Sequence, residues 1–393
     1  MKQERLLGYD VFYAAYQRVK DLYENKDMVI VSFSGGKDST CCLELAIMAA
    51  RETGNLPVKV AMRDDEIMYP PVWEYCERVA KRKEVEFHWV YANQPVLNIY
   101  NRAMPYYWAF DPQLDPEEWV RKPPEYAYKI PVQNINYVGG PEMFPPEYEG
   151  QRLVNITGLR VAESPSRRMG LHSSKGYLTK YNYKSKKHMA RPIYDWKRGD
   201  VWKFIKENNF DYCTAYDTMF RLAGKGEDAG RIAPPFMAKA SLNYLSKASQ
   251  AWPRWFDKCC RRVGGIRTAA QFGMRAVTPQ RRLKETWKEC FHRTCIEEAP
   301  EWIAERAAKV AKEAEKLHSR HSTSPLPENN KTKCPMCRNL GSWQALANTM
   351  FNGDPFAMKV GNMGTKKDGT RIKYIEPEFF RKGAGTWGGP ASW

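Results

Sequence analysis

The chain has 393 residues, of which 43% are hydrophobic and 27% are charged. These are the values of a globular protein with two or three cored domains, and they exclude fibrous and intrinsically disordered classes. No apolar stretch reaches membrane-spanning length, and residues 1–5 lack the apolar core of a signal peptide, so we expect a cytoplasmic protein with no membrane contact. Ten cysteines are too few in a chain this long to indicate a disulfide scaffold.

The charge is unevenly distributed along the chain. Residues 1–150 carry 17 Lys and Arg against 23 Asp and Glu, whereas residues 151–393 carry 45 against 22, a net charge of +23. Because Lys and Arg bind phosphates with release of counterions, the later part is predicted to bind a nucleic acid, DNA or tRNA. Near the middle of the chain, two aromatic residues interleave with lysines, a pattern that suits base stacking: Tyr181, Tyr183, Lys184, Lys186 and Lys187. A solubilising surface, or a charged pocket for one nucleotide, is the alternative.

Predicted helices and strands alternate in the first half of the chain. An amphipathic helix is expected over residues 9–24, followed by strands over 27–33, 58–62, 85–91 and 152–158 and by helices over 40–50, 70–83 and 197–208. This alternation predicts an α/β fold with a parallel, doubly wound sheet covered on both faces. We expect it to form one domain over residues 1–225, with an irregular insert, rich in Pro, Tyr and Trp, over residues 95–150.

Beyond about residue 225 the pattern becomes mainly helical. The clearest helices are expected over residues 242–256 and 297–318, within a helical and cysteine-cluster region that spans residues 226–360. Residues 319–333 have the composition of an exposed loop. The Gly- and Lys-rich tail, residues 361–393, is expected to pack poorly unless a partner orders it.

The most informative motif lies between the first predicted strand and the helix that follows it. Its glycines let backbone amides approach an anion closely, and the helix N-terminus adds partial positive charge. A lysine supplies a mobile cation, and an aspartate is suited to hold Mg²⁺ beside the phosphates. The spacing is not the Walker pattern. The motif consists of Ser34, Gly35, Gly36, Lys37, Asp38 and Ser39, and it predicts a phosphate-binding loop. An ordinary strand-turn-helix corner is the alternative.

Polar residues follow three of the predicted strands. Ser34, Asp64 and Arg160 each stand at or just after the carboxyl end of a strand. Ligands of parallel α/β sheets bind at the carboxyl ends of the strands. The three positions therefore predict a single site.

Several segments resemble a known family. The loop at residues 34–39 resembles the PP-loop of ATP pyrophosphatases and phosphoadenosine phosphosulfate (PAPS) reductases. Residues 158–168 resemble the Gly-x-Arg-x-x-Glu-Ser-x-x-Arg signature of PAPS reductase-like proteins, and residues 192–196 with 200–202 resemble their Pro-x-x-Asp-Trp and Asp-x-Trp segments. The resemblance implies an adenine nucleotide alpha hydrolase-like fold.

A narrower branch is indicated by residues 108–111, 119–124, 216–224 and 342–346. These resemble the PAPS sulfotransferase-like branch typified by the immunoglobulin-binding regulator A protein, and the overall resemblance covers residues 25–350. Asp64 and Glu66 match the Asp-x-Glu of that branch, which implies contact with adenosine or magnesium. Helix capping before residue 70 is the alternative.

The resemblance implies a role for each motif residue. The loop would bind the pyrophosphate end of ATP or the phosphosulfate. Arg160 and Arg168 suit bidentate phosphate contact as charge develops, and Glu163 would orient them or contact ribose or metal; a surface ion pair is the alternative for each arginine. The expected catalytic residues are Lys37, Asp38, Arg160 and Glu163. The expected nucleotide-binding residues are Ser34, Gly35, Gly36, Lys37, Asp38, Ser39, Asp64, Glu66, Arg160 and Arg168.

One family feature is missing from the sequence. Sulfonucleotide reductases carry a catalytic cysteine in a C-terminal Glu-Cys-Gly-x-His segment, which this chain lacks. True PAPS reduction is therefore not expected. Cys41 and Cys42 could be reactive thiols at a helix start, but buried hydrophobic residues of a core helix are the favoured interpretation.

A second chemical cluster involves four late cysteines. Cys290, Cys295, Cys334 and Cys337 form two close pairs and predict a structural zinc site, for which His292 is a spare fifth candidate. An iron–sulfur cluster and unligated thiols are the alternatives.

Together these features predict a PP-loop enzyme that uses ATP or PAPS, with magnesium and zinc as its metals. It would cleave ATP between the α- and β-phosphates with nucleotidyl transfer, or transfer a sulfur group, in sulfur metabolism or in the modification of DNA or tRNA. A non-catalytic regulator that keeps the nucleotide pocket and binds DNA or a protein partner is the alternative.

Overall fold

The computed structural model describes residues 8–25, 28–130, 153–163, 167–169, 171, 176–180, 182, 187–223, 232, 241–337, 340–361, 363 and 371–383. Contacts between Cα atoms divide the chain into two compact units. Unit 1 comprises Met1–Gln94, Ala109–Ile232 and Ala251–Trp255, and unit 2 comprises Pro95–Trp108, Ala233–Gln250 and Phe256–Trp393.

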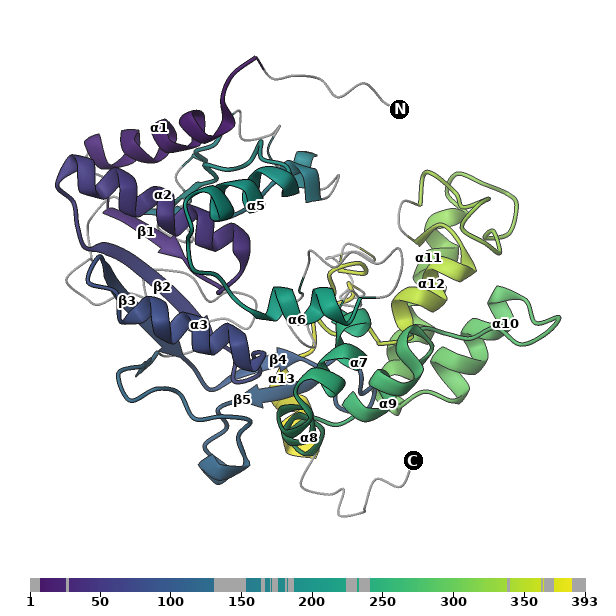
Figure 1. Cartoon of the computed structure of the whole chain (residues 1–393). Coiled ribbons are helices and arrows are strands. Elements are labelled where there is room, and N and C mark those ends of the chain that lie inside the picture. Colours follow the sequence, from purple (N-terminus) through teal and green to yellow (C-terminus); the bar gives the residue numbers. More distant parts are fainter. Residues whose placement is uncertain are drawn as a thin grey trace. The chain divides into compact units, whose positions relative to one another are not determined.

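Unit 1 is built on a six-stranded parallel sheet, which confirms the predicted α/β fold (Figure 1). The strand order is β6-β3-β2-β1-β7-β8. Because β2 lies on one side of β1 and β7 on the other, the order reverses between β1 and β7, where open α/β sheets bind their ligands. The strands are β1 Met28–Ser32, β2 Val58–Asp64, β3 Val85–Tyr91, β6 Tyr128–Lys129, β7 Leu153–Ile156 and β8 His188–Ala190.

The central strands are buried because both their faces are apolar. Val29, Ile30 and Val31 of β1 are at most 3% exposed, and all four residues of β7 are buried. Near-continuous apolar runs of this kind are characteristic of parallel strands covered on both sides. The three-residue strand β8 was not expected from the sequence, because it is too short for a periodic pattern.

Helices α1 (Val11–Glu24), α2 (Lys37–Thr53) and α5 (Arg198–Glu207) pack together beside β1 (Figure 1). Helix α3 (Pro70–Ala80) packs against β3. Helix α2 is buried along most of its length and ends at Gly54, whose φ of +71° is the left-handed conformation that glycine adopts most readily. Helix α2 begins three residues earlier than predicted, so Lys37 and Asp38 lie in its first turn.

The Pro-x-x-Asp-Trp segment, residues 192–196, holds α1 against the rest of unit 1. The Arg18 guanidinium donates to both carboxylate oxygens of Asp195, at 2.9 and 2.8 Å, and the Tyr9 hydroxyl donates to Asp195 Oδ2 at 2.8 Å. The Trp196 indole donates to the Val11 carbonyl at 3.0 Å. Asp195 and Trp196 therefore brace the fold.

The described part of the predicted insert is more regular than expected. Strands β4 (Gln94–Leu97) and β5 (Tyr106–Ala109) form a two-stranded sheet, followed by the 3-10 turn η1 (Pro116–Glu118). Residues 131–150 of this segment lie outside the described residues.

Unit 2 is mainly helical, as predicted for this part of the chain. Its core includes Phe291, Val310, Trp343, Leu346 and Met350. The expected helix over residues 242–256 is two helices, because a proline at residue 253 lacks the N–H needed to continue a helix. The helices from residue 242 on are α7 Leu242–Ala251, α8 Pro253–Arg262, α9 Ile266–Phe272, α10 Trp287–His292, α11 Glu301–His318, α12 Trp343–Met350 and α13 Pro377–Gly383.

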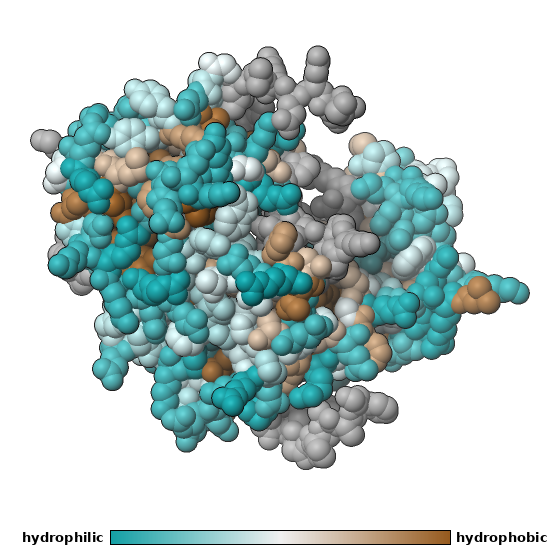
Figure 2. Space-filling view, in the orientation of Figure 1, coloured by the Kyte–Doolittle hydropathy of each residue, from teal (hydrophilic) through white to brown (hydrophobic). Residues whose placement is uncertain are grey.

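The C-terminal tail is packed in part. Helix α13 belongs to it, and Ile372 and Phe380 are 3% and 5% exposed. Among the described residues, no helix is long and apolar enough to cross a bilayer. The face drawn in Figure 2 is largely hydrophilic, with its apolar residues in small separate patches.

The first prediction concerns the contact of α1 with residue 195. Asp195→Ala leaves the Arg18 guanidinium without its carboxylate partner, so we expect the free energy of unfolding to fall by about 1.5–3 kcal/mol. Burial and Asp195 raise the pKa of Tyr9 to about 12, and this pKa should fall in the variant. Urea denaturation and ultraviolet titration of the tyrosines measure both effects. Asp21→Ala, an exposed position on the same helix, is the control; equal stability of the two variants would refute the bracing role.

Candidate functional site

The loop Ser34–Ser39 joins β1 to α2 and is closed by its own hydrogen bonds. The Ser39 hydroxyl donates to the Gly36 carbonyl at 2.8 Å and lies 3.3 Å from the Ser34 backbone nitrogen, which donates to it. Gly35 has a φ of +67°, and a Cβ there would lie 2.9 Å from Val72 Cγ1, so no larger residue fits. Gly36 caps α2 without a side-chain acceptor. The loop therefore brings the partial positive charge of the α2 N-terminus to the end of β1.

Four charged side chains are connected beside this loop. Lys37 Nζ donates to Asp38 Oδ2 at 3.0 Å, and Arg160 Nε donates to Asp38 Oδ1 at 2.5 Å. Arg160 also donates to Glu163 Oε1 at 3.2 Å. Lys37 and Arg160 are only 3% and 4% exposed, so both cations are desolvated and held by carboxylates. The structure thus brings together all four of the predicted catalytic residues.

Gly158 allows the two signature segments to meet. A Cβ at this position would lie 2.7 Å from the backbone carbonyl carbon of Asp38 and 2.9 Å from its Cβ. Such distances essentially never occur between real side chains and backbone, so a larger residue would push the segment after β7 away from α2. This contact gives a physical reason for the glycine two residues before Arg160.

The second predicted arginine has a different environment. Arg168 is exposed and makes no ion pair within the described residues, whereas Arg167 pairs with Glu163. Residues 164–166 of the signature lie outside the described residues. The structure therefore connects Arg167, and not Arg168, to the charged chain of the site.

Asp64 and Glu66 were predicted to contact adenosine or magnesium, but the structure uses their carboxylates inside the fold. Both residues are fully buried. Asp64 accepts hydrogen bonds from the Glu66 backbone and from the Trp89 indole, each at 2.9 Å, and it pairs with Arg121.

Glu66 is engaged in a similar way. It accepts from the backbone nitrogens of Phe110 at 2.7 Å and Val120 at 3.0 Å. Both carboxylates therefore hold the segment of residues 110–121 against the end of β2.

Two tyrosines contribute to the site without having been predicted to do so. The Tyr216 hydroxyl, from α6 (Ala215–Arg221), accepts from the Lys37 backbone nitrogen at 3.1 Å, and its ring lies 5.4 Å from Lys37 Nζ. Burial raises the pKa of Tyr216, so it stays protonated. Tyr75 lies 3.1 Å from the Thr40 hydroxyl and donates to the Asp211 carbonyl at 3.0 Å. Tyr216 begins the motif of residues 216–224, but only the fold shows that it faces the loop.

Cys41 and Cys42 are fully buried, and burial raises the pKa of both thiols. They are therefore not activated nucleophiles, in agreement with the favoured interpretation.

Lys187 is 3% exposed and so is not a surface cation, while Lys184, Lys186, Tyr181 and Tyr183 lie outside the described residues.

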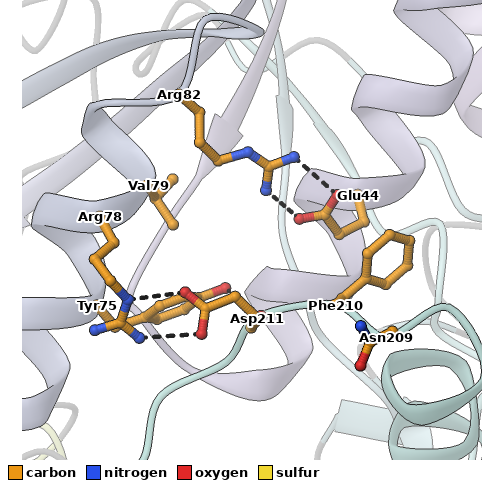
Figure 3. Close-up of a pocket in the computed structure, with 8 residues that line it drawn as sticks. All are labelled: Glu44, Tyr75, Arg78, Val79, Arg82, Asn209, Phe210 and Asp211. Atoms are coloured by element: carbon orange, nitrogen blue, oxygen red, sulfur yellow. Dashed lines mark hydrogen bonds and ion pairs between the residues drawn. The ribbon is translucent and has the colours of Figure 1, made fainter.

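A pocket of about 320 Å³ lies between α2, α3 and residues 209–211, and none of the loop residues lines it (Figure 3). Its charged side chains already pair with each other. Arg82 bonds Glu44, and Arg78 bonds Asp211 at 2.9 and 3.1 Å. The pocket is therefore separate from the charged chain beside the loop, and its own charges are neutralised.

The predicted metal ligands divide between two places. Cys334 and Cys337 lie with His318 and His321. The ligand atoms of all four residues are within 4.8 Å of one another. Cys290 and Cys295 do not join them: both are fully buried, and the Cys295 sulfur lies 3.7 Å from the Ala347 carbonyl.

The physical reason is helix geometry. Residues 293–297 form a π-helical turn that directs Cys295 into the apolar core of unit 2. The structure thus brings two of the four predicted cysteines together with two histidines, a group that could hold a metal ion. The histidines were missed because two cysteine pairs alone satisfied the expected ligand count.

Comparison with known proteins supports the superfamily suggested by the motifs. Residues 146–271 match the family model of the phosphoadenosine phosphosulfate reductase domain, a region that includes the signature around Arg160. The uncharacterized protein YbdN of Escherichia coli (strain K12) is 26% identical over 283 residues, which is 67% of each chain. The domain match supports a member of the PAPS reductase-like superfamily.

Two solved structures are similar at low identity. FMN adenylyltransferase of Candida glabrata has a TM-score of 0.36 and 12% identity, covering 65% of this chain and 86% of that one. PAPS reductase of Candida auris, in a phosphate complex, has a TM-score of 0.29 and 11% identity, covering 55% and 93%. At these values the similarity carries no argument about function.

The second prediction distinguishes the two roles of Asp64. Asp64→Ala leaves the Arg121 guanidinium, whose side chain is 11% exposed, without its carboxylate, so we expect a loss of about 3–5 kcal/mol in unfolding free energy. Glu117→Ala, which removes a 75% exposed partner of Lys122, is the matched control and should cost less than about 1 kcal/mol. Chemical denaturation measures both. Wild-type stability together with abolished nucleotide binding in Asp64→Ala would instead support the ligand-contact role.

Proposed function

We propose that this protein is a PP-loop nucleotide-dependent enzyme of the branch indicated by its motifs. It would bind ATP or PAPS at residues 34–39 and catalyse α–β cleavage with nucleotidyl transfer, or transfer of a sulfur group. The observation that carries the proposal is the charged chain Lys37–Asp38–Arg160–Glu163 at the reversal of strand order, where α/β sheets bind ligands.

The arrangement suits a polyphosphate. Terminal phosphates would lie at the N-terminus of α2, where the helix dipole favours anions. Phosphate oxygens would then replace Asp38 as the partner of Lys37 and Arg160. Both cations are already desolvated and oriented, so they could stabilise charge that develops on a leaving pyrophosphate without much reorganisation. The guanidinium adds a planar, two-pronged contact.

Magnesium fits the same arrangement through a single carboxylate. Mg²⁺ commonly binds one or two protein carboxylates, with substrate phosphates and water completing its shell. Asp64 and Glu66 are engaged in the fold, whereas Asp38 is the carboxylate of the loop itself. The ion would neutralise phosphate charge, while Asp38 positions it once Lys37 and Arg160 turn to the nucleotide.

Transfer of a nucleotidyl or sulfur group is favoured over a reduction in which a thiol of unit 1 takes part. Its four cysteines are Cys41, Cys42, Cys76 and Cys213, and all are buried. Burial raises the pKa of each, so none is a ready thiolate. An enzyme that transfers a nucleotidyl or sulfur group does not need such a thiol.

The third prediction concerns the nucleotide. We expect ATP or PAPS to bind with micromolar affinity, roughly −8 kcal/mol. Lys37→Met and Arg160→Gln should each weaken binding at least tenfold or abolish turnover, because each removes a buried cation. Calorimetry measures binding, and assays of pyrophosphate, adenosine bisphosphate and sulfite measure turnover.

The control for this prediction is Arg51→Ala, a 60% exposed cation in the last turn of the same helix α2, which should bind normally. Wild-type binding and turnover in both site variants would refute the assignment. Binding without turnover in the wild type would instead indicate the regulator.

A nucleic-acid acceptor is favoured by the surface of residues 256–290. This segment carries nine Lys and Arg against three Asp and Glu. The aromatic Phe272, 54% exposed, stands between these cations in the sequence and is available to stack on a base. We propose that this surface binds the phosphates of DNA or tRNA. Its exposed cations are Lys258, Arg261, Arg267, Arg275, Arg281, Arg282, Lys284 and Lys288.

The fourth prediction tests this surface. Replacing Lys258, Arg267 and Arg275 by Ala should lower affinity for DNA or tRNA and reduce the salt slope by up to roughly 3, about one for each phosphate that the variant no longer neutralises. Titrations at several salt concentrations measure the slope. The control variant removes the same charge from exposed positions of α11: Lys309, Lys312 and Lys316. Equal effects in the two variants, or no binding at low salt, would contradict the proposal.

A further inference from the structure

The end of α11 and the loop that follows it bring two histidines and two cysteines together. His318 is the last residue of α11, and the backbone of His321 bonds back to the His318 carbonyl at 3.2 Å. The two imidazole rings therefore lie on one side of the turn, with centroids 5.4 Å apart. Cys334 and Cys337 come from the far end of the loop.

Three sulfur–nitrogen distances among the four ligand atoms match a single tetrahedral ion. His321 Nε2 lies 3.3 Å from the Cys334 sulfur and 3.4 Å from the Cys337 sulfur, and His318 Nδ1 lies 3.4 Å from the Cys337 sulfur. Tetrahedral zinc, with bonds of about 2.3 Å to sulfur and about 2.0 Å to nitrogen, separates sulfur from nitrogen by about 3.5 Å. The observed separations agree with this value within about 0.2 Å, the tolerance expected of a metal site.

Backbone hydrogen bonds close the turn that carries the two cysteines. The Cys334 backbone nitrogen donates to the Gly341 carbonyl at 2.9 Å. A Cβ at Gly341 would lie 2.4 Å from the Cys334 carbonyl oxygen, so glycine is required for this return of the chain.

The loop of residues 319–337 buries little apolar surface. Of the described residues 319–337, Leu326 alone is buried, and most of the others are exposed. A segment that buries so little apolar surface gains stability from a metal, because binding the ion fixes residues that are far apart in sequence.

We propose that His318, His321, Cys334 and Cys337 bind one structural zinc ion that fastens this loop to the end of α11. All four positions of the tetrahedron are filled by protein atoms, whereas a catalytic zinc keeps one position for water or substrate. Two sulfur and two nitrogen ligands in a tetrahedron select zinc among common metals.

An iron–sulfur cluster with the same residue types is a poorer match. In a two-iron centre with two cysteine and two histidine ligands, the histidines bind one iron and the cysteines the other. Sulfur and nitrogen ligands would then lie on opposite sides of the cluster. Here both cysteine sulfurs lie 3.4 Å or less from a histidine nitrogen.

Metal analysis of the full chain, without a histidine tag and under reducing conditions, tests the proposal. We expect one zinc per chain and an X-ray absorption shell of two sulfurs at about 2.3 Å and two nitrogens at about 2.0 Å. Cys334→Ala with Cys337→Ala should lower the zinc content at least tenfold. Cys290→Ala with Cys295→Ala removes the same number of thiols and should keep the zinc.

Several results would overturn the proposal: wild-type protein without zinc, a four-sulfur shell, bound iron with acid-labile sulfide, or zinc that persists in the Cys334 and Cys337 variant. The absorption shell is measured on wild-type protein, so it decides the question even where a variant fails to fold. Chelation of the wild type should also speed proteolytic cleavage within residues 319–337 at least tenfold.

Discussion

The site depends on one carboxylate shared by two cations. Asp38 lies in the first turn of α2 and accepts hydrogen bonds from Lys37, its neighbour, and from Arg160, which follows a different strand. An uncompensated buried charge is strongly destabilising, so the three side chains hold one another in place. Because β1 and β7 are adjacent, this contact joins the two strand ends at which the sheet reverses its order. The same interaction therefore stabilises the apo fold and keeps two cations ready for an anion.

The surroundings of this contact are arranged to let it form. Gly158 leaves room for the Asp38 backbone, Gly35 adopts the conformation of the turn, and Tyr216 takes the first amide of α2. The carboxylates of Asp64 and Glu66 play a supporting part at the neighbouring strand, where they hold the segment of residues 110–121. A reacting nucleotide would thus meet the ion pairs that Asp38 makes with Lys37 and Arg160.

Much of this could be predicted from the sequence. Apolar runs and helical periodicity indicated β1, β2, β3 and β7, and the glycine-rich loop and the segment around Arg160 indicated where they converge. The role of Asp64 and Glu66 could not be predicted, because a carboxylate after a strand has the same pattern whether it faces a ligand or the amides of a distant segment. His318 and His321 were missed for a similar reason: their partners lie beyond a loop whose path is not encoded by periodicity. The division of the helix expected over residues 242–256 into α7 and α8, in contrast, follows from the proline at residue 253, which is visible in the sequence.

The most direct test of the central claim is a crystal structure of the protein with magnesium and an ATP analogue that cannot be cleaved between the α- and β-phosphates. The account predicts that the terminal phosphates lie at the N-terminus of α2, with Lys37 and Arg160 turned from Asp38 to phosphate oxygens. A nucleotide bound away from residues 34–39, with both ion pairs of Asp38 intact, would contradict it.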